Sequence, residues 1–153
     1  MAYSFEKIVS IIIIFMFVCL PMGWMLVANE PPGAYYPTSN EKIDAFLQAT
    51  GLSICEKSAT QWNVIGALGG TSVLISKDCQ VTELDSRAYI HLQKFDTQEH
   101  RDSAVNYIKA SINRLNMNGA VFTYGAYVIL VQGPTGGKPN FETISQVKEA
   151  LTE

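Results

Sequence analysis

The sequence predicts an α+β protein in which one N-terminal transmembrane helix precedes a two-layer α/β sandwich. Three observations lead to this prediction: one long uncharged apolar run near the N-terminus, apolar residues that alternate along several later stretches, and apolar residues at helical spacing between those stretches. We expect the sandwich to contain about five mainly antiparallel strands and three helices, in residues 38–153.

The apolar run extends from Ile8 to Val27, 20 residues without a charged side chain. As a helix that rises ~1.5 Å per residue, it would span roughly 30 Å, the thickness of the hydrocarbon core of a bilayer. A cleaved signal peptide is the alternative, but its apolar core is usually about 7–15 residues long and ends at small residues. This run is longer and ends in bulky side chains, so residues 8–27 are predicted to be a membrane anchor.

The charges that flank the anchor predict its orientation. Lys7 and the amino group precede it, partly offset by Glu6, whereas no lysine or arginine follows it before Lys42. Positive charge is retained on the cytoplasmic side of a span. We therefore expect a single-pass protein of the cell membrane with residues 1–7 in the cytoplasm and the C-terminal domain outside it.

The composition argues against several classes of function. The 153 residues include 14 acidic and 11 basic ones, which gives a net charge of −3. Nucleic-acid binding requires a basic surface, which this acidic balance does not indicate. The two histidines, His91 and His100, belong to no zinc-ligand spacing, and the chain has no G-x-S-x-G nucleophile elbow. We expect a non-catalytic domain without a metal or a cofactor.

Residues 28–37 contain three prolines and are predicted to form an extended, semi-rigid linker. Tyr35 and Tyr36 would lie either at the membrane surface or against the domain. The first helix of the domain should then start at a capping box formed by Thr38 and Glu41. Its buried face would hold the apolar residues Ile43, Phe46 and Leu47.

Two strands are expected next, at residues 53–62 and 71–77, and between them lie Gly66, Gly69 and Gly70. A phosphate-binding glycine loop needs a strand before it and a helix after it. Here a strand follows, so the glycines are interpreted as a connection.

Residues 88–95 alternate as a half-buried strand does. Ile90 and Leu92 should point to one face, and Tyr89, His91 and Gln93 to the other. A helix follows Asp96, with a buried stripe that includes Val105 and Ile108. We expect the polar residues of its first turns, Arg101 among them, to be solvated.

The stretch 120–133 predicts a β-hairpin that turns at Gly125 and Ala126. This register pairs Tyr124 with Tyr127 and Phe122 with Ile129, and both faces of the hairpin are apolar, as in central strands. A last helix should begin after Asn140. The strand–helix–strand order around residues 88–124 resembles part of a ferredoxin-like fold, a likeness of architecture that implies no function.

Cys55 and Cys79 are the cysteines that follow the anchor. If the first two strands form a hairpin centred near residue 67, the two cysteines lie opposite each other, at a separation that suits a disulfide. Such a bond would persist outside the cytoplasm. Two free buried thiols are the alternative, and the sequence leaves both open.

In a two-layer domain the helices cover only one face of the sheet. We expect the other face to meet a protein partner or a second copy of the chain, because exposed aromatic surface favours association. The residues predicted on this face are Tyr89, His91, Gln93, Phe122, Tyr124, Tyr127 and Ile129.

The sequence thus predicts an accessory subunit of a membrane or envelope complex that binds protein through this face. One alternative is a small-molecule-binding or sensing domain that uses the sheet face and the loop containing Gly66 and Gly70. A second alternative is a thiol redox protein that uses Cys55 and Cys79.

Overall fold

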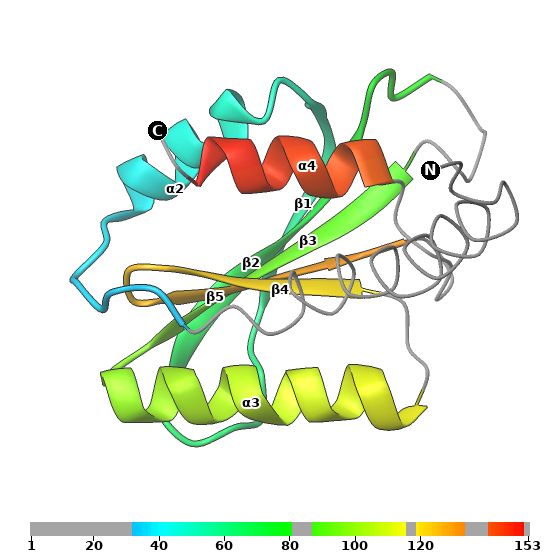
Figure 1. The fold of residues 1–153 in the computed structure, drawn as a ribbon. Coiled ribbons are helices and arrows are strands. Elements are labelled where there is room, and N and C mark those ends of the chain that lie inside the picture. Colours follow the sequence, from blue (N-terminus) through cyan, green and yellow to red (C-terminus); the bar gives the residue numbers. More distant parts are fainter. Residues whose placement is uncertain (1–31, 81–86, 116–118, 134–140, 152–153) are drawn as a thin grey trace, which may run out of the picture. The chain divides into compact units, whose positions relative to one another are not determined.

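The computed structural model describes residues 32–80, 87–115, 119–133 and 141–151, which belong to one compact unit, Pro32–Glu153 (Figure 1). The predicted cytoplasmic tail, the anchor from Ile8 to Val27, residues 28–31 and the capping residue Asn140 lie outside the described residues. None of the described helices combines the length and the apolar character that a membrane span requires.

The predicted α+β class is confirmed: the described residues form a five-stranded antiparallel sheet and three helices. In chain order the elements are α2 (Asn40–Ala49), β1 (Ser53–Thr60), β2 (Ala67–Ser76), β3 (Arg87–Phe95), α3 (Gln98–Leu115), β4 (Gly119–Tyr124), β5 (Tyr127–Gln132) and α4 (Phe141–Ala150).

The strands are arranged in the order β1-β2-β3-β5-β4, and all neighbours are antiparallel. Strands β3 and β4 both run antiparallel to β5, so they are parallel to each other, and α3 connects them. This is a split β-α-β arrangement, in which a third strand lies between the two that the helix joins.

The hairpin of β4 and β5 has the predicted register, with Phe122 opposite Ile129 and Tyr124 opposite Tyr127. Gly125 opens the turn with φ +53°, a left-handed conformation that glycine adopts without steric cost. A Cβ atom at this position would also collide with the hydroxyl of Thr38, so the turn and its packing both require glycine.

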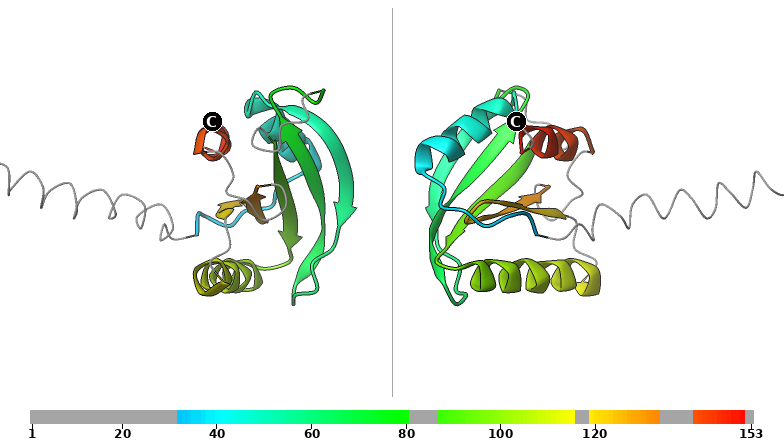
Figure 2. Two further views of the ribbon diagram at one scale, coloured as in Figure 1. Left: turned by 90° about the vertical axis from the view of Figure 1, so that its right-hand side faces the viewer. Right: turned by 60° about the vertical axis from the view of Figure 1, so that its left-hand side comes forward.

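The helices cover both faces of the sheet, which corrects the two-layer prediction. Successive residues of β5 belong to different cores: Tyr127 and Ile129 pack with α2 and α4, whereas Val128 packs beneath α3. Figures 1 and 2 show β4 and β5 between α3 on one side and α2 with α4 on the other. The hairpin is apolar on both faces, and α3 covers at least part of the face that the two-layer prediction left exposed.

The larger core, between the sheet and the helices α2 and α4, contains the predicted inward residues of α2 and β3. Its fully buried aliphatic side chains include Leu47, Val73, Ile75, Ile90, Leu92, Ile129, Val131 and Val147. The smaller core contains Phe95, Ala104, Val105 and Val128, with Trp62 packed against it.

The predicted capping box at the start of α2 is wrong. Helix α2 begins at Asn40 after Ser39, and Thr38 is buried. The Thr38 hydroxyl donates to the carbonyl of Tyr36 (3.2 Å) and accepts from the amide of Ala126 (3.4 Å). A contact with the distant β4–β5 turn therefore occupies the side chain that the local pattern assigned to the helix.

The glycines predicted as a connection lie partly within a strand. Gly69 and Gly70 belong to β2, where the register to β3 shifts between Ala67 and Gly70. The carbonyl oxygen of Leu92 occupies the place of a Cβ atom on Gly70. The close approach of β3 to β2 thus explains a glycine in the middle of a strand.

Candidate functional site

The seven residues predicted to form one interaction face are divided between the two sides of the sheet. Tyr89, His91 and Gln93 are on the same side as α3, while the aromatic residues of the hairpin face α2 and α4. The prediction of one continuous face is therefore wrong. Alternation shows which residues share a face within one strand, but the alignment of two strands separated by a helix depends on tertiary pairing. The residues on the α2 side are Phe122, Tyr124, Tyr127 and Ile129.

Gln93 is part of the folded interior and not of a surface. Its side chain is fully buried, and its Oε1 accepts a hydrogen bond from the backbone amide of Trp62 at 2.9 Å. Its Nε2 donates to the carbonyl of Lys94 at 3.2 Å. Gln93 thereby ties the start of the β1–β2 loop to β3, which is a structural role.

Tyr89 and His91 are half-buried, and their rings stack with centroids 5.9 Å apart and an interplanar angle of 10°. His91 Nδ1 lies 2.9 Å from the hydroxyl oxygen of Ser72, the residue directly opposite it on β2. Burial lowers the pKa of His91 below its ordinary value, so the imidazole is neutral at pH 7. Within the described part of the chain no carboxylate hydrogen-bonds to His91, so the pair lacks the third group of a catalytic triad.

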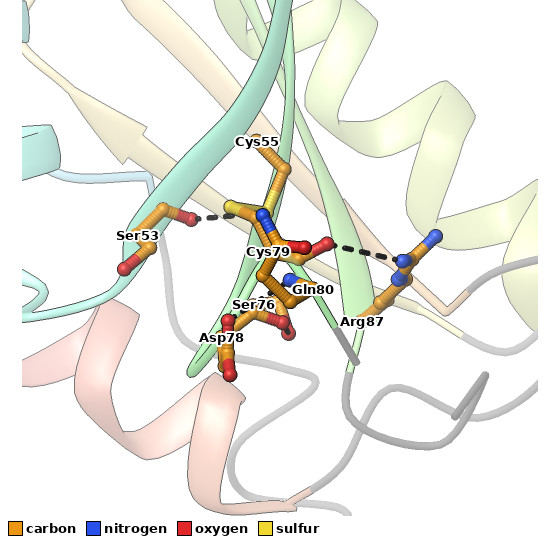
Figure 3. Close-up of a disulfide and its surroundings, with 7 residues drawn as sticks. All are labelled: Ser53, Cys55, Ser76, Asp78, Cys79, Gln80 and Arg87. Carbon is orange, nitrogen blue, oxygen red and sulfur yellow. Dashed lines mark hydrogen bonds between the residues drawn. A yellow bond between two sulfur atoms is a disulfide. The ribbon is translucent and has the colours of Figure 1, made fainter. Parts of the chain in front are cut away.

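A disulfide joins Cys55 and Cys79, with the sulfur atoms 2.06 Å apart and the Cα atoms 5.2 Å apart (Figure 3). The predicted register of this hairpin is nevertheless wrong. Glu56 pairs with Leu74, which centres the hairpin on residue 65, the mean of 56 and 74. Cys55 lies at a bulge in β1, and Cys79 follows the end of β2, so the two cysteines are not a directly opposed strand pair.

The turn that carries Cys79 is held by its own hydrogen bonds. The Ser76 hydroxyl donates to the carbonyl of Asp78 (3.0 Å), and the carboxylate of Asp78 accepts from the amide of Gln80 (2.9 Å). Across the described ranges no group of three or more His, Cys, Asp or Glu side chains is placed to bind a metal ion. The disulfide thus joins a bulge to an ordered turn.

A groove of about 630 Å³ opens between α2 and the ends of strands β1, β2 and β3. Its volume lies in the range of ligand pockets, about 300–1,000 Å³. The glycine residues Gly69 and Gly70 contribute backbone to one wall, and two lysines, Lys57 and Lys94, contribute ammonium groups. The remaining lining residues are Asn40, Ile43, Asp44, Leu47, Leu68, Thr71, Leu92 and Tyr127.

The segment of residues 32–38, hereafter the docked segment, lies against the domain and is not a free linker. The amide of Gly33 donates to the hydroxyl of Thr123 at 2.7 Å. The Tyr35 hydroxyl is close to the carbonyls of Phe95 (3.2 Å) and Asp96 (2.9 Å) and can donate to either. Of the two alternatives for the tyrosines, the structure therefore places Tyr35 on the domain, and Tyr36 packs edge-to-face on Tyr124 as well.

Arg101 holds the docked segment, although the sequence predicted a solvated side chain at this position. Its guanidinium is fully buried and donates to the backbone carbonyls of Gly33 (2.7 Å) and Ala34 (3.1 Å) and to that of Gly125. Asp102 Oδ1 accepts a hydrogen bond from Nε at 2.8 Å and lies 2.7 Å from Nη2, which forms an ion pair. The buried guanidinium thus makes four hydrogen bonds, and Asp102 balances its charge.

One sequence signal could have revealed the burial of Arg101. The residue lies four positions before Val105 and seven before Ile108, on the apolar stripe of α3. A charged residue on such a stripe is normally assigned to the surface, because a buried charge is costly unless it is paired. Its partners here are carbonyl groups far away in the sequence, which no local pattern shows.

The comparisons with known proteins identify no relative. No protein-family model matches the chain, no curated protein matches it, and no solved structure matches its fold.

Proposed function

We propose that this chain is a single-pass membrane protein whose non-catalytic extracytoplasmic domain binds another protein, as an accessory subunit of a membrane or envelope complex. The bilayer holds it through residues 8–27, with the N-terminus in the cytoplasm. The partner is another subunit or a second copy of the chain.

The docked segment is the observation that carries this proposal. Because Arg101 and Tyr35 tie residues 33–35 to the domain, only residues 28–31 separate the end of the predicted span at Val27 from the folded unit. Five Cα-to-Cα steps extend at most about 18 Å. A domain attached in this way stays close to the bilayer, which favours a partner in or at the same membrane.

Two further features support the proposal. The disulfide between Cys55 and Cys79 is typical of a domain outside the cytoplasm. An apolar groove of about 220 Å³ lies between α3 and the β1–β2 loop, beside the exposed side chains of Ile65 (80% exposed) and Tyr107 (65% exposed). Exposed apolar and aromatic side chains of this kind are enriched where proteins associate.

The topology is tested with protease added to intact cells. We expect the domain to be digested from outside and the mature chain to retain residues 1–27. A mature N-terminus near Asn29 would refute the anchor. Digestion that occurs only after cell lysis would refute the predicted orientation but not the membrane anchor.

The interaction is tested by changing Tyr89 to glutamate and recovering the full-length protein in mild detergent. Tyr89 is half-buried beside His91, so the domain should still fold, while recovery of the partner should fall by about tenfold or more, as at an interface anchor. Gln48→Glu, which adds the same charge at an exposed position of α2 away from the groove between α3 and the β1–β2 loop, is the matched control. Unfolding of the Tyr89 variant, or unchanged recovery of the partner, would contradict the prediction.

Small-molecule binding is the second candidate, and the groove beside α2 is the observation that favours it. The predicted site was the sheet face with the glycine loop, and the groove combines Gly69 and Gly70 with side chains of the sheet. The thiol redox alternative has no comparable support, since the two cysteines lie outside any CxxC motif.

A further inference from the structure

We propose that the groove beside α2 binds a small organic anion, a carboxylate or phosphate attached to an apolar group. This inference rests on the second candidate function. It adds the chemical class of the ligand and the residue that receives its charge, Lys94.

The charges of the groove leave one ammonium group available. Lys57 and Asp44 form an ion pair across the opening, with Nζ and Oδ1 2.9 Å apart, and so neutralise each other. Lys94 has no ion pair or hydrogen bond from its ammonium within the described residues; its Nζ lies 6.0 Å from the ring centroid of Tyr127. The lining therefore carries a net charge of +1 (two lysines and one aspartate), located at Lys94.

The apolar part of the groove lies beside this charge. Ile43 and Leu47 on α2 and Leu92 on β3 contribute buried side chains to the lining. Leu68 at the rim is 61% exposed, an unusual exposure for a leucine within a strand. Covering such surface removes apolar area from water, so a ligand with an apolar group gains affinity here that a bare ion does not.

Backbone forms part of the groove wall. Gly69 has φ +106°, a conformation that side-chain-bearing residues rarely adopt, and Gly70 lies against the backbone of β3. The two glycines therefore present backbone to the groove between Leu68 and Thr71. On the far side the Tyr127 hydroxyl donates to Asn40 Oδ1 at 3.1 Å. Because the other lysine of the lining is paired with Asp44, Lys94 is the cation that an incoming anion meets.

The experiment uses 4-(trifluoromethyl)benzoate as the probe, observed by ¹⁹F NMR with the full-length protein in lipid nanodiscs. Empty nanodiscs measure partition into lipid. We expect saturable binding to the native protein and at least tenfold weaker binding to the Lys94→Gln variant. Lys94→Arg should bind within about threefold of the native protein. Lys77→Gln, which removes an exposed lysine that is paired with Glu142 outside the groove, should bind like the native protein.

Two further measurements test separately whether the groove binds a ligand and whether that ligand must be an anion. The Thr71→Phe variant fills the groove and should abolish binding, and the neutral amide of the probe should bind at least tenfold more weakly than the benzoate. If the amide and the benzoate bind equally, and Thr71→Phe abolishes this binding while Lys94→Gln does not change it, the inference of an anionic ligand is refuted. The groove would then remain a ligand site. Binding unaffected by Thr71→Phe, or no saturable binding to the native protein, would refute both. Circular dichroism and an intact disulfide confirm that each variant is folded, and none of these outcomes bears on the proposed protein partner.

Discussion

Changing Arg101 to methionine should lower the free energy of unfolding by about 3–5 kcal/mol, the loss typical when one partner of a buried charged network is removed. Methionine has a similar length but no donors, so the carbonyls of Gly33, Ala34 and Gly125 would lose the N–H groups they accept from. Each buried polar group left without a partner costs about 1–3 kcal/mol. Urea unfolding of the full-length protein in mild detergent, followed by near-UV circular dichroism, measures the change.

The same substitution should release the docked segment. We expect protease to cleave near Tyr35 and Tyr36 in the Arg101→Met variant at concentrations that leave the native protein intact. Arg114→Met, at an exposed position near the end of the same helix, is the matched control and should change neither measurement. Arg101→Lys should restore only part of the stability, because a lysine cannot reproduce the five donors of the planar guanidinium. Native stability and resistance to cleavage in Arg101→Met would refute the role assigned to this residue.

Reduction of the disulfide between Cys55 and Cys79 should cost about 3.5 kcal/mol of stability, the chain-entropy value for a closed loop of this length. The two cysteines are separated by 24 positions in the sequence, so the bond restricts a substantial part of the unfolded chain. Urea unfolding with and without dithiothreitol measures the difference. A double variant, Cys55→Ala with Cys79→Ala, should have the stability of the reduced native protein and should not respond to dithiothreitol.

The Cys19→Ser variant controls for the third cysteine, which lies within the predicted anchor. It should retain both the native stability and the response to dithiothreitol. Alkylation of Cys55 and Cys79 as free thiols, in protein purified without reductant, would refute the bond and remove one support for an extracytoplasmic domain.

The sequence by itself determined the features that depend on neighbouring residues. Apolar periodicity, together with turn and capping residues, predicted every helix and strand of the described residues, although the strand bounds differ by a few residues from those predicted. The hairpin of β4 and β5 was predicted with its full register, because a two-residue turn that starts with Gly125 permits only one alignment of the flanking strands. Hairpin geometry also suggested that Cys55 and Cys79 pair, since a small error in register still leaves the two thiols close together.

Only the tertiary structure decided which surfaces meet. Both faces of the hairpin are apolar, so the pattern could not show that α3 covers one face while α2 and α4 cover the other. Alternation could not show that Tyr89 and Tyr127 lie on opposite sides of the sheet. Arg101 illustrates the physical reason: the free energy of burying its charge depends on carbonyl groups contributed by residues 33, 34 and 125. Such partners converge only when the chain is folded, whereas helices, strands and tight turns depend on residues a few positions apart.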